Sequence, residues 1–250
     1  MNNGKILIGV AIGDRYERQA DVMTKSFLEF NKTWDVRVFK GNEIDQLIPS
    51  RFRNDRPFNK SEIGRWCAVK QVLGEGYEHA LYCDNDLCFY GEYNEHPHDL
   101  TLFPHYLSDK ARRLASHRII FDGVPNLGMF EAYGDGGAEI CDIVVREVTD
   151  NPPAFHHRKM TGKIWTQGVA SYLPYLGYNV AYDNNPSYNM SWWSLEYEDR
   201  KLEEVSGSFQ VLFEGKHHDL VSFHFSGLDL LDKYGDEARK VKEGYLRQLR

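Results

Sequence analysis

The stretch His79-Ala-Leu-Tyr-Cys-Asp-Asn-Asp-Leu-Cys-Phe-Tyr90 carries most of the information about the fold of this 250-residue chain. Most of its residues are apolar, which predicts a buried strand over residues 79–90. Two carboxylates, Asp84 and Asp86, interrupt the apolar run. Because residues two apart on a strand share a face, both carboxylates are expected to point the same way. Neighbouring buried carboxylates repel each other unless a cation or hydrogen-bond donors compensate.

A divalent metal ion resolves this conflict. Carboxylate oxygens suit Mg²⁺ or Mn²⁺, which bind one or two carboxylates and leave the remaining positions to water and substrate phosphates. The natural co-ligand is therefore a nucleotide diphosphate. Taken by itself, however, Asp84-Asn85-Asp86 is more typical of a turn that ends a strand, because Asp and Asn are common there.

In the rest of the chain, predicted strands alternate with predicted helices. Further strands are expected at 5–12, 35–39, 100–103, 124–130, 178–182 and 221–225. Helices are expected at 18–31, from an N-cap at Ser61 to about 73, at 138–148, and over a short segment capped by Thr166. This alternation predicts an α/β fold with a mostly parallel central sheet flanked by helices, in which ligands bind at the carboxyl ends of strands.

The whole chain, residues 1–250, is expected to form a single domain, because it contains no internal repeat and no long linker rich in Gly, Ser or Pro. From about residue 229, apolar residues recur at helical spacing with charges on the other face. They predict a C-terminal surface helix that packs on the sheet, formed by Leu231, Tyr234, Ala238, Val241 and Tyr245.

The composition argues against several classes of partner. With 30 basic and 37 acidic side chains, the formal charge is −7, which gives no long-range attraction to nucleic acid. Binding of nucleic acid through a local basic patch is not excluded. The longest apolar run near the start, 6–12, is far short of the ~20 residues of a membrane span, so none is expected. Four cysteines without C-x-x-C spacing predict reduced thiols and a cytoplasmic location.

The sequence Leu81-Tyr-Cys-Asp-Asn-Asp86, preceded by a helix that carries Arg65, resembles the metal-binding strand of GT-A glycosyltransferases. It is most similar to family 8, the glycogenin and bacterial galactosyltransferase group, and shorter matches follow in the same order over residues 5–227. The resemblance implies a GT-A fold and the metal-dependent transfer of a sugar to a hydroxyl acceptor. It further implies a nucleotide-diphosphate donor, first of all a UDP-sugar, Mn²⁺ or Mg²⁺ as cofactor, and retention of the anomeric configuration.

The N-terminal matches concern the donor nucleotide. Val10 to Tyr16 resembles the family's first strand and loop, which implies that Asp14 and Tyr16 hold the base. Lys60 and Arg65 match the place of a cation that contacts the donor, and a guanidinium suits phosphate oxygens or sugar hydroxyls.

The C-terminal matches concern the sugar and the metal. Asn126-Leu-Gly128 resembles the Asn-x-Gly strand beside the donor sugar. In the family segment that matches 165–167, an acid precedes Gln167, but here Thr166 replaces the acid. The segment 221–227 resembles the family's histidine segment without its Lys-Pro-Trp. The implied metal ligands are Asp84, Asp86 and His224, and the implied catalytic residues are Arg65, Asn126 and Gln167.

Several alternatives stay open. An inverting enzyme needs a carboxylate base, for which Asp122, Asp183 or Glu196 is available. A sugar-phosphate nucleotidyltransferase also uses carboxylates and a metal, and a nucleotide-sugar-binding protein without turnover is consistent with Thr166. Trp192 and Trp193 offer a flat aromatic platform for the acceptor, although large aromatics are also common in cores.

Overall fold

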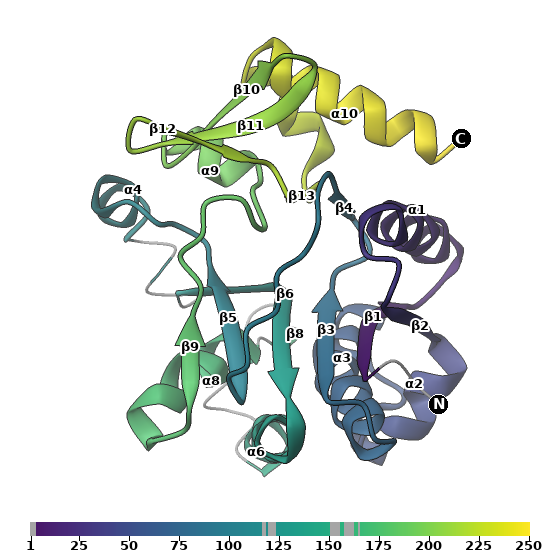
Figure 1. Ribbon diagram of the computed structural model, residues 1–250. Coiled ribbons are helices and arrows are strands. Elements are labelled where there is room, and N and C mark those ends of the chain that lie inside the picture. Colours follow the sequence, from purple (N-terminus) through teal and green to yellow (C-terminus); the bar gives the residue numbers. More distant parts are fainter. Residues whose placement is uncertain (1–3, 117–118, 120–123, 151–155, 158–162, 165) are drawn as a thin grey trace.

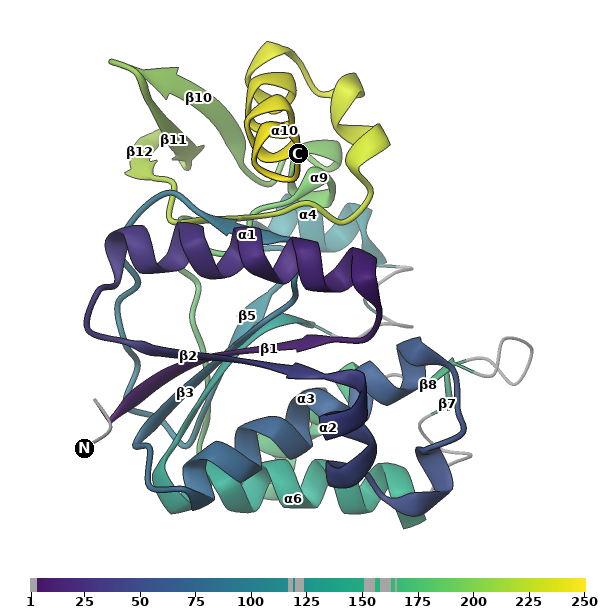
Figure 2. The ribbon, with the colours of Figure 1, turned by 90° about the vertical axis from the view of Figure 1, so that its right-hand side faces the viewer.

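The computed structural model describes residues 4–116, 119, 124–150, 156–157, 163–164 and 166–250. It is a layered α/β structure in which a central sheet separates two groups of helices (Figures 1 and 2). The strands of the central sheet are β1 (Lys5–Ala11), β2 (Asp35–Lys40), β3 (His79–Cys83), β5 (Leu100–Pro104), β6 (Pro125–Tyr133) and β9 (Val180–Tyr182).

The central sheet is mainly parallel, as expected, with the strand order β2-β1-β3-β6-β5-β9. The pairs β1/β2, β1/β3 and β5/β9 are parallel. Strand β6 runs antiparallel to both β3 and β5. This reversal places the amino end of β6 beside the carboxyl end of β3, where Asp84 follows the strand.

One face of the sheet is covered by α2 (Gly41–Leu47), α3 (Pro57–Gly74), α6 (Gly134–Asp150) and α8 (Thr166–Tyr172), and the other by α1 (Asp14–Phe30) (Figure 2). The prediction that Ser61 caps a helix is wrong, because α3 begins four residues earlier, at Pro57. Proline at the first helical position has the backbone torsion that a helix needs and no N–H to leave unpaired. The predicted inner face of α3 is buried, with Ile63, Trp66 and Val69 at 1% exposure or less.

The predicted strand over residues 79–90 is two strands that belong to different sheets. β3 ends at Cys83, and β4 (Leu87–Phe89) leaves the central sheet to pair antiparallel with β13 (Ser222–His224). A turn at residues 84–87 separates them, closed by a hydrogen bond from the Leu87 N–H to the Asp84 carbonyl (3.1 Å). The carboxylates therefore lie in a turn rather than on one face of a strand.

Above α1 lies a second layer of short elements (Figure 1). A three-stranded antiparallel sheet, β10 (Lys201–Val205), β11 (Ser208–Phe213) and β12 (Lys216–Asp219), was not predicted from the sequence. Its two tight turns, Ser206-Gly207 and Glu214-Gly215, have positive φ at both residues, which is typical of two-residue hairpins. Those dipeptides were the signal that could have predicted it.

The C-terminal helix α10 (Asp236–Gln248) packs on this second layer, not on the central sheet as expected. Tyr245 stacks on Phe225 with ring centroids 4.1 Å apart. Within the described residues, the remaining helices are α4 (Asp109–Leu114) and α9 (Trp192–Glu196), with 3₁₀ turns η1 (Ser50–Phe52), η2 (Leu173–Leu176) and η3 (Leu228–Lys233). Strand β7 (His156–His157) pairs with β8 (Lys163–Ile164).

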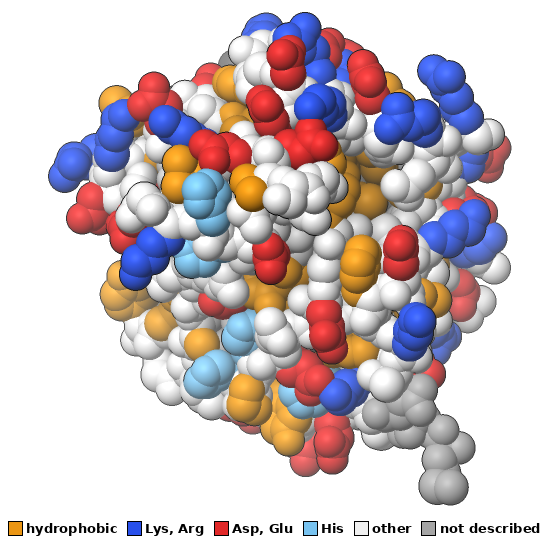
Figure 3. All heavy atoms as spheres, turned by 45° about the horizontal axis from the view of Figure 1, so that its top comes forward, with side chains coloured by type: hydrophobic (Ala, Val, Ile, Leu, Met, Phe, Trp, Pro, Cys, Tyr) orange, Lys and Arg blue, Asp and Glu red, His pale blue; other side chains and the backbone are white. Residues whose placement is uncertain are grey.

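Over the described residues, every helix is too short or too polar to cross a bilayer. On the face in Figure 3, acidic and basic side chains are interspersed, which agrees with the small net charge of the chain.

A buried carboxylate, Glu131 of β6, ties the segment between β4 and β5 to the sheet. Its Oε2 accepts hydrogen bonds from the Tyr93 hydroxyl and from the His96 backbone N–H, both at 2.9 Å. His79 Nδ1 lies 3.0 Å from its Oε1, and His96 Nδ1 lies 3.2 Å from its Oε2. These contacts replace the water that the carboxylate loses on burial.

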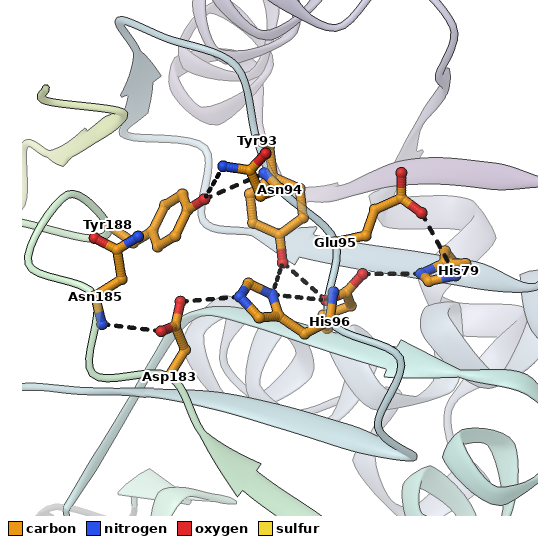
Figure 4. Close-up of polar contacts among 9 residues, drawn as sticks. His79, Tyr93, Asn94, Glu95, His96, Asp183, Asn185 and Tyr188 are labelled. Carbon is orange, nitrogen blue, oxygen red and sulfur yellow. Dashed lines mark hydrogen bonds and ion pairs between the residues drawn. The ribbon is translucent and has the colours of Figure 1, made fainter.

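His96 extends the network to the segment that follows β9 (Figure 4). Its Nε2 forms an ion pair with Asp183 Oδ2 at 3.1 Å, and Asp183 also accepts a hydrogen bond from the Asn185 N–H. Burial alone lowers the pKa of His96, but hydrogen bonds to Asp183 and Glu131 outweigh burial and raise the pKa to about 9. The imidazolium therefore bridges two carboxylates at neutral pH.

This network predicts a stability that falls as the medium becomes alkaline. Because the folded pKa of His96 lies above its unfolded value of about 6.5, its contribution is complete below pH 6.5 and lost as the pH rises through 9. Urea unfolding of His96→Gln should show a loss of up to about 3 kcal/mol at pH 6 that shrinks by pH 9.5. The control is His98→Gln on the exposed neighbouring histidine, and an equal loss at both pH values would contradict the prediction.

Candidate active site

The turn between β3 and β4 is held from three sides. The Asp84 N–H donates to the Gly128 carbonyl of β6 (2.7 Å), and the Asn85 side-chain amide donates to the Val10 carbonyl of β1 (2.7 Å). The Phe225 N–H donates to the Asp86 carbonyl (2.7 Å). Both aspartates are thus placed by backbone bonds to β6 and to the β13 segment, and their side chains remain about one quarter exposed.

His224 reaches the turn because β13 pairs with β4, with His224 opposite Leu87 in the register. Its Nε2 lies 3.0 Å from Asp86 Oδ1 and 3.8 Å from Asp84 Oδ2. The other oxygen of Asp84, Oδ1, accepts a hydrogen bond from the Tyr82 hydroxyl (2.7 Å). That bond turns Asp84 so that Oδ2 faces His224.

The three residues predicted to bind the metal therefore come together. Ligand atoms from Asp84, Asp86 and His224 all lie within 4.8 Å of one another. Two carboxylate oxygens and one imidazole nitrogen fit Mn²⁺ or Mg²⁺, with open positions left for water and phosphate oxygens. The donor set and its partial exposure are thus compatible with a divalent cation that also contacts a ligand.

The charges at this site compensate one another without the ion. Burial opposes ionisation of Asp86, but the neighbouring His224 holds the pKa of Asp86 below its ordinary value. Burial alone lowers the pKa of His224, and Asp86 outweighs that effect and raises it. Asp86 and His224 therefore each favour the charged form of the other.

Arg65 of α3 lies on the other side of Asp84, with its NH2 3.9 Å from Asp84 Oδ1. Its NH1 donates to the Leu127 carbonyl (2.7 Å), and its NH2 also pairs with Glu62 one turn earlier on the helix. Arg65 is 5% exposed, and its guanidinium carbon lies 5.2 Å from the centre of the Tyr82 ring. Arg65 is thus a fixed cation beside the carboxylates.

These side chains line a cavity of about 410 Å³, a size that suits a small molecule. Its walls come from the ends of β1, β3 and β6, the first half of α3, the start of α1, and the segments around α9 and β13. Among the residues predicted to act on the donor or metal, those that line it are Tyr16, Arg65, Asp84, Asp86, Asn126, Gln167 and His224.

Two predicted base- or donor-binding residues lie elsewhere. Asp14 is the exposed first residue of α1 and is absent from the described cavity wall. Lys60 forms an ion pair with Asp45 of α2 (2.5 Å) and is likewise absent from that wall. The structure therefore gives no support for donor contacts from these two residues, since one projects into solvent and the other is bound by an acid of the neighbouring helix.

The amino end of β6 supplies the polar groups expected beside a donor sugar. The Asn126 Oδ1 accepts a hydrogen bond from the Gly128 N–H (2.9 Å), which fixes the amide plane. Its Nδ2 is buried and has no hydrogen-bond partner among the described residues. The Gln167 Nε2 donates to the Pro125 carbonyl (2.8 Å), so α8 is joined to the same end of β6.

Of the three carboxylates considered as bases for an inverting reaction, the two that the structure describes do not line the cavity. Asp183 pairs with His96 in the network of Figure 4, and Glu196 is exposed at the end of α9. Asp122 lies outside the described residues.

Trp193 is 7% exposed and packs edge-on against the His224 ring, with centroids 5.4 Å apart. Trp193 therefore supports the His224 ring.

Two residues of the site were missed in the sequence. Tyr82 precedes Asp84 by two positions, the spacing that brings side chains to one side of a strand. Glu62 precedes Arg65 by three positions, the spacing of neighbours on a helix. Both spacings were visible, but only the fold shows that the Tyr82 hydroxyl orients Asp84 and that Glu62 lines the cavity.

Solved structures with a similar fold are glycosyltransferases. No family of known sequences matches the chain, and no curated protein matches it. A solved glycosyltransferase involved in the glycosylation of the major capsid of PBCV-1 is similar over 97% of this chain and 99% of its own, with a TM-score of 0.55 and 11% identity. The chain has the fold of GT-A glycosyltransferases.

Two further structures agree. The glycosyltransferase GlyE of Streptococcus pneumoniae TIGR4 is similar over 98% of this chain and 60% of its own, with a TM-score of 0.58 and 12% identity. Mouse xyloside xylosyltransferase 1 is similar over 90% of this chain and 98% of its own, with a TM-score of 0.52 and 9% identity. At such identities the likeness concerns the fold, and the chemistry must be argued from the site.

The close approach of His224 to β6 generates a prediction. A Cβ at Gly128 would lie 2.5 Å from Cε1 and 2.8 Å from Nδ1 of His224, so Gly128→Ala must displace the buried ring. We expect a loss of about 1–3 kcal/mol in stability and a roughly 10–100-fold weaker affinity for Mn²⁺, measured by urea unfolding and calorimetric titration.

The control is Gly74→Ala at the far end of α3, where a Cβ meets nothing within 4 Å. It should leave the Mn²⁺ affinity unchanged. If Gly128→Ala binds Mn²⁺ as tightly as the unaltered protein, the ring does not hold the ion.

Proposed function

We propose that this protein is a metal-dependent glycosyltransferase related to family 8. It transfers a sugar from a nucleotide-diphosphate sugar, first of all a UDP-sugar, to a hydroxyl acceptor, with retention of the anomeric configuration. One observation carries the proposal: Asp84, Asp86 and His224 offer ligand atoms within 4.8 Å of one another in the wall of a cavity that also contains Arg65. The GT-A fold that the chain shares with solved glycosyltransferases supports sugar transfer in general.

The leaving group of such a reaction is a nucleoside diphosphate, whose negative charge grows as the glycosidic bond breaks. Asp84, Asp86 and His224 would hold Mn²⁺ or Mg²⁺, which would supply positive charge to stabilise the leaving group. Arg65 is available on the other side of Asp84, already oriented by Glu62 and the Leu127 carbonyl, so little reorganisation is needed when the charge develops.

The remaining residues bind and orient the donor. Tyr16, half-exposed at the cavity wall, offers an aromatic ring that can stack on the base. The unpartnered Nδ2 of Asn126 is a buried donor that a sugar hydroxyl can satisfy. Gln167 lies at the same end of β6 and completes this subsite. Retention is carried over from the family resemblance, and the cytoplasmic location stays a prediction from cysteine content.

The test is a thermal-shift screen of the protein with UDP, UDP-glucose and UDP-galactose, with and without Mn²⁺. A ligand at saturating concentration should raise the melting temperature by about 5 °C or more, because it binds only the folded state. Asp86→Ala should lose the Mn²⁺-dependent part of this shift. Glu29→Ala, which removes an exposed acid near the end of α1, should retain it.

Product analysis separates the alternatives. A glycosyltransferase releases UDP from a UDP-sugar slowly with water and faster with an acceptor, whereas a binding protein without turnover releases none. A nucleotidyltransferase would instead form a UDP-sugar from UTP and a sugar 1-phosphate. If Asp86→Ala keeps the full Mn²⁺-dependent shift, the metal site is misassigned.

A further inference from the structure

A third carboxylate faces the cavity from α3. Glu62 lies one helical turn before Arg65, is 2% exposed, and lines the cavity together with Asn126 and Gln167. Among the described residues of that wall, the acids are Glu62, Asp84 and Asp86. The two aspartates are grouped with His224 as possible metal ligands, and Glu62 is not in that group. The role of the Glu62 carboxylate toward a bound ligand is therefore still to be assigned.

Glu62 is held in one orientation by two neighbours. Its Oε1 pairs with the guanidinium of Arg65. Its Oε2 accepts hydrogen bonds from the Thr166 backbone N–H (3.2 Å) and from the Thr166 hydroxyl (3.1 Å). A residue on α3 and the first residue of α8 are thus joined through one carboxylate, at the place where the sequence suggested that an acid is missing.

The hydrogen-bond capacity of this carboxylate is not used up. Each carboxylate oxygen has two acceptor positions. Thr166 fills both positions on Oε2, and among the described residues Arg65 fills one position on Oε1. The second position on Oε1 is left for a donor from the ligand. Because the side chain is buried and anchored at both oxygens, it cannot turn to solvent to satisfy this position.

We propose that Glu62 is a specificity-determining residue that accepts a hydrogen bond from a hydroxyl of the donor sugar. This proposal rests on the proposed function, because it assumes that the cavity binds a nucleotide-sugar. It also explains Thr166, which stands where the family segment has an acid. In this chain Glu62 of α3 supplies the carboxylate, and Thr166 orients it. A sugar hydroxyl is a hydrogen-bond donor, which fits the open acceptor position on Oε1, whereas the diphosphate carries only acceptor oxygens and cannot donate to it.

The test separates binding of the sugar from binding of the nucleotide. Glu62→Gln is titrated by calorimetry with UDP, UDP-glucose and UDP-galactose in Mn²⁺. A hydrogen bond to a charged group is worth about tenfold or more in affinity. We expect affinity for the sugar nucleotide preferred by the unaltered protein to fall by about that factor more than affinity for UDP, which changes only through the altered partner of Arg65. The matched control, Glu75→Gln at the exposed C-cap of α3, should change neither.

Two more variants keep the proposal testable if Glu62→Gln does not fold. Glu62→Asp keeps the negative charge for Arg65 but shortens the side chain by one methylene, and should give the same selective loss. Thr166→Val keeps the carboxylate and removes one of its anchors, and should give a smaller selective loss. An equal loss of UDP and sugar-nucleotide affinity, or an unchanged ratio between them, overturns the assignment.

Failure of the proposed function gives a different result. If the unaltered protein binds neither UDP nor the UDP-sugars in Mn²⁺, the glycosyltransferase proposal fails, and the role of Glu62 fails with it. If the unaltered protein binds all three and the ratio does not respond to Glu62, only the inference about Glu62 is wrong.

Discussion

Electrostatic repulsion between Asp84 and Asp86 is the constraint on which the site depends. Two carboxylates in one tight turn are stable only where positive charge and hydrogen-bond donors surround them. Three segments supply these: β13 brings His224, α3 brings Arg65, and β3 brings the Tyr82 hydroxyl. The pairing of β4 with β13 is what delivers the histidine, so the second layer and the site depend on each other.

The reversed direction of β6 has a related consequence. Because β6 is antiparallel to β3, its first residues extend past Cys83, the last residue of β3, which pairs with Met129. Asn126, with its unpartnered amide, thereby comes to the same edge as Asp84, and Gly128 leaves just enough room for the His224 ring. A parallel strand in this place would bring its carboxyl end here instead, and the polar residues at its start would lie at the far edge.

Much of the fold could be predicted from periodicity. The strands β1, β2, β5 and β6 and the helices α1, α3 and α6 correspond to apolar patterns that local packing requires, although their ends moved by several residues. The break at residues 84–87 and the β10–β12 sheet could not be predicted in this way. The first depends on which distant strand β4 pairs with, and the second was signalled only by Ser-Gly and Glu-Gly dipeptides at its turns.

For the site, side-chain chemistry alone identifies Asp84, Asp86 and His224 as residues that can bind a cation, whatever the fold. The packing of the fold brings these three residues together, pairs Lys60 with Asp45, and turns Glu62 toward the cavity. The physical reason is that side-chain chemistry is a local property. Distances between residues up to 140 positions apart, such as Asp84 and His224, follow from strand pairing and packing, which no short motif contains.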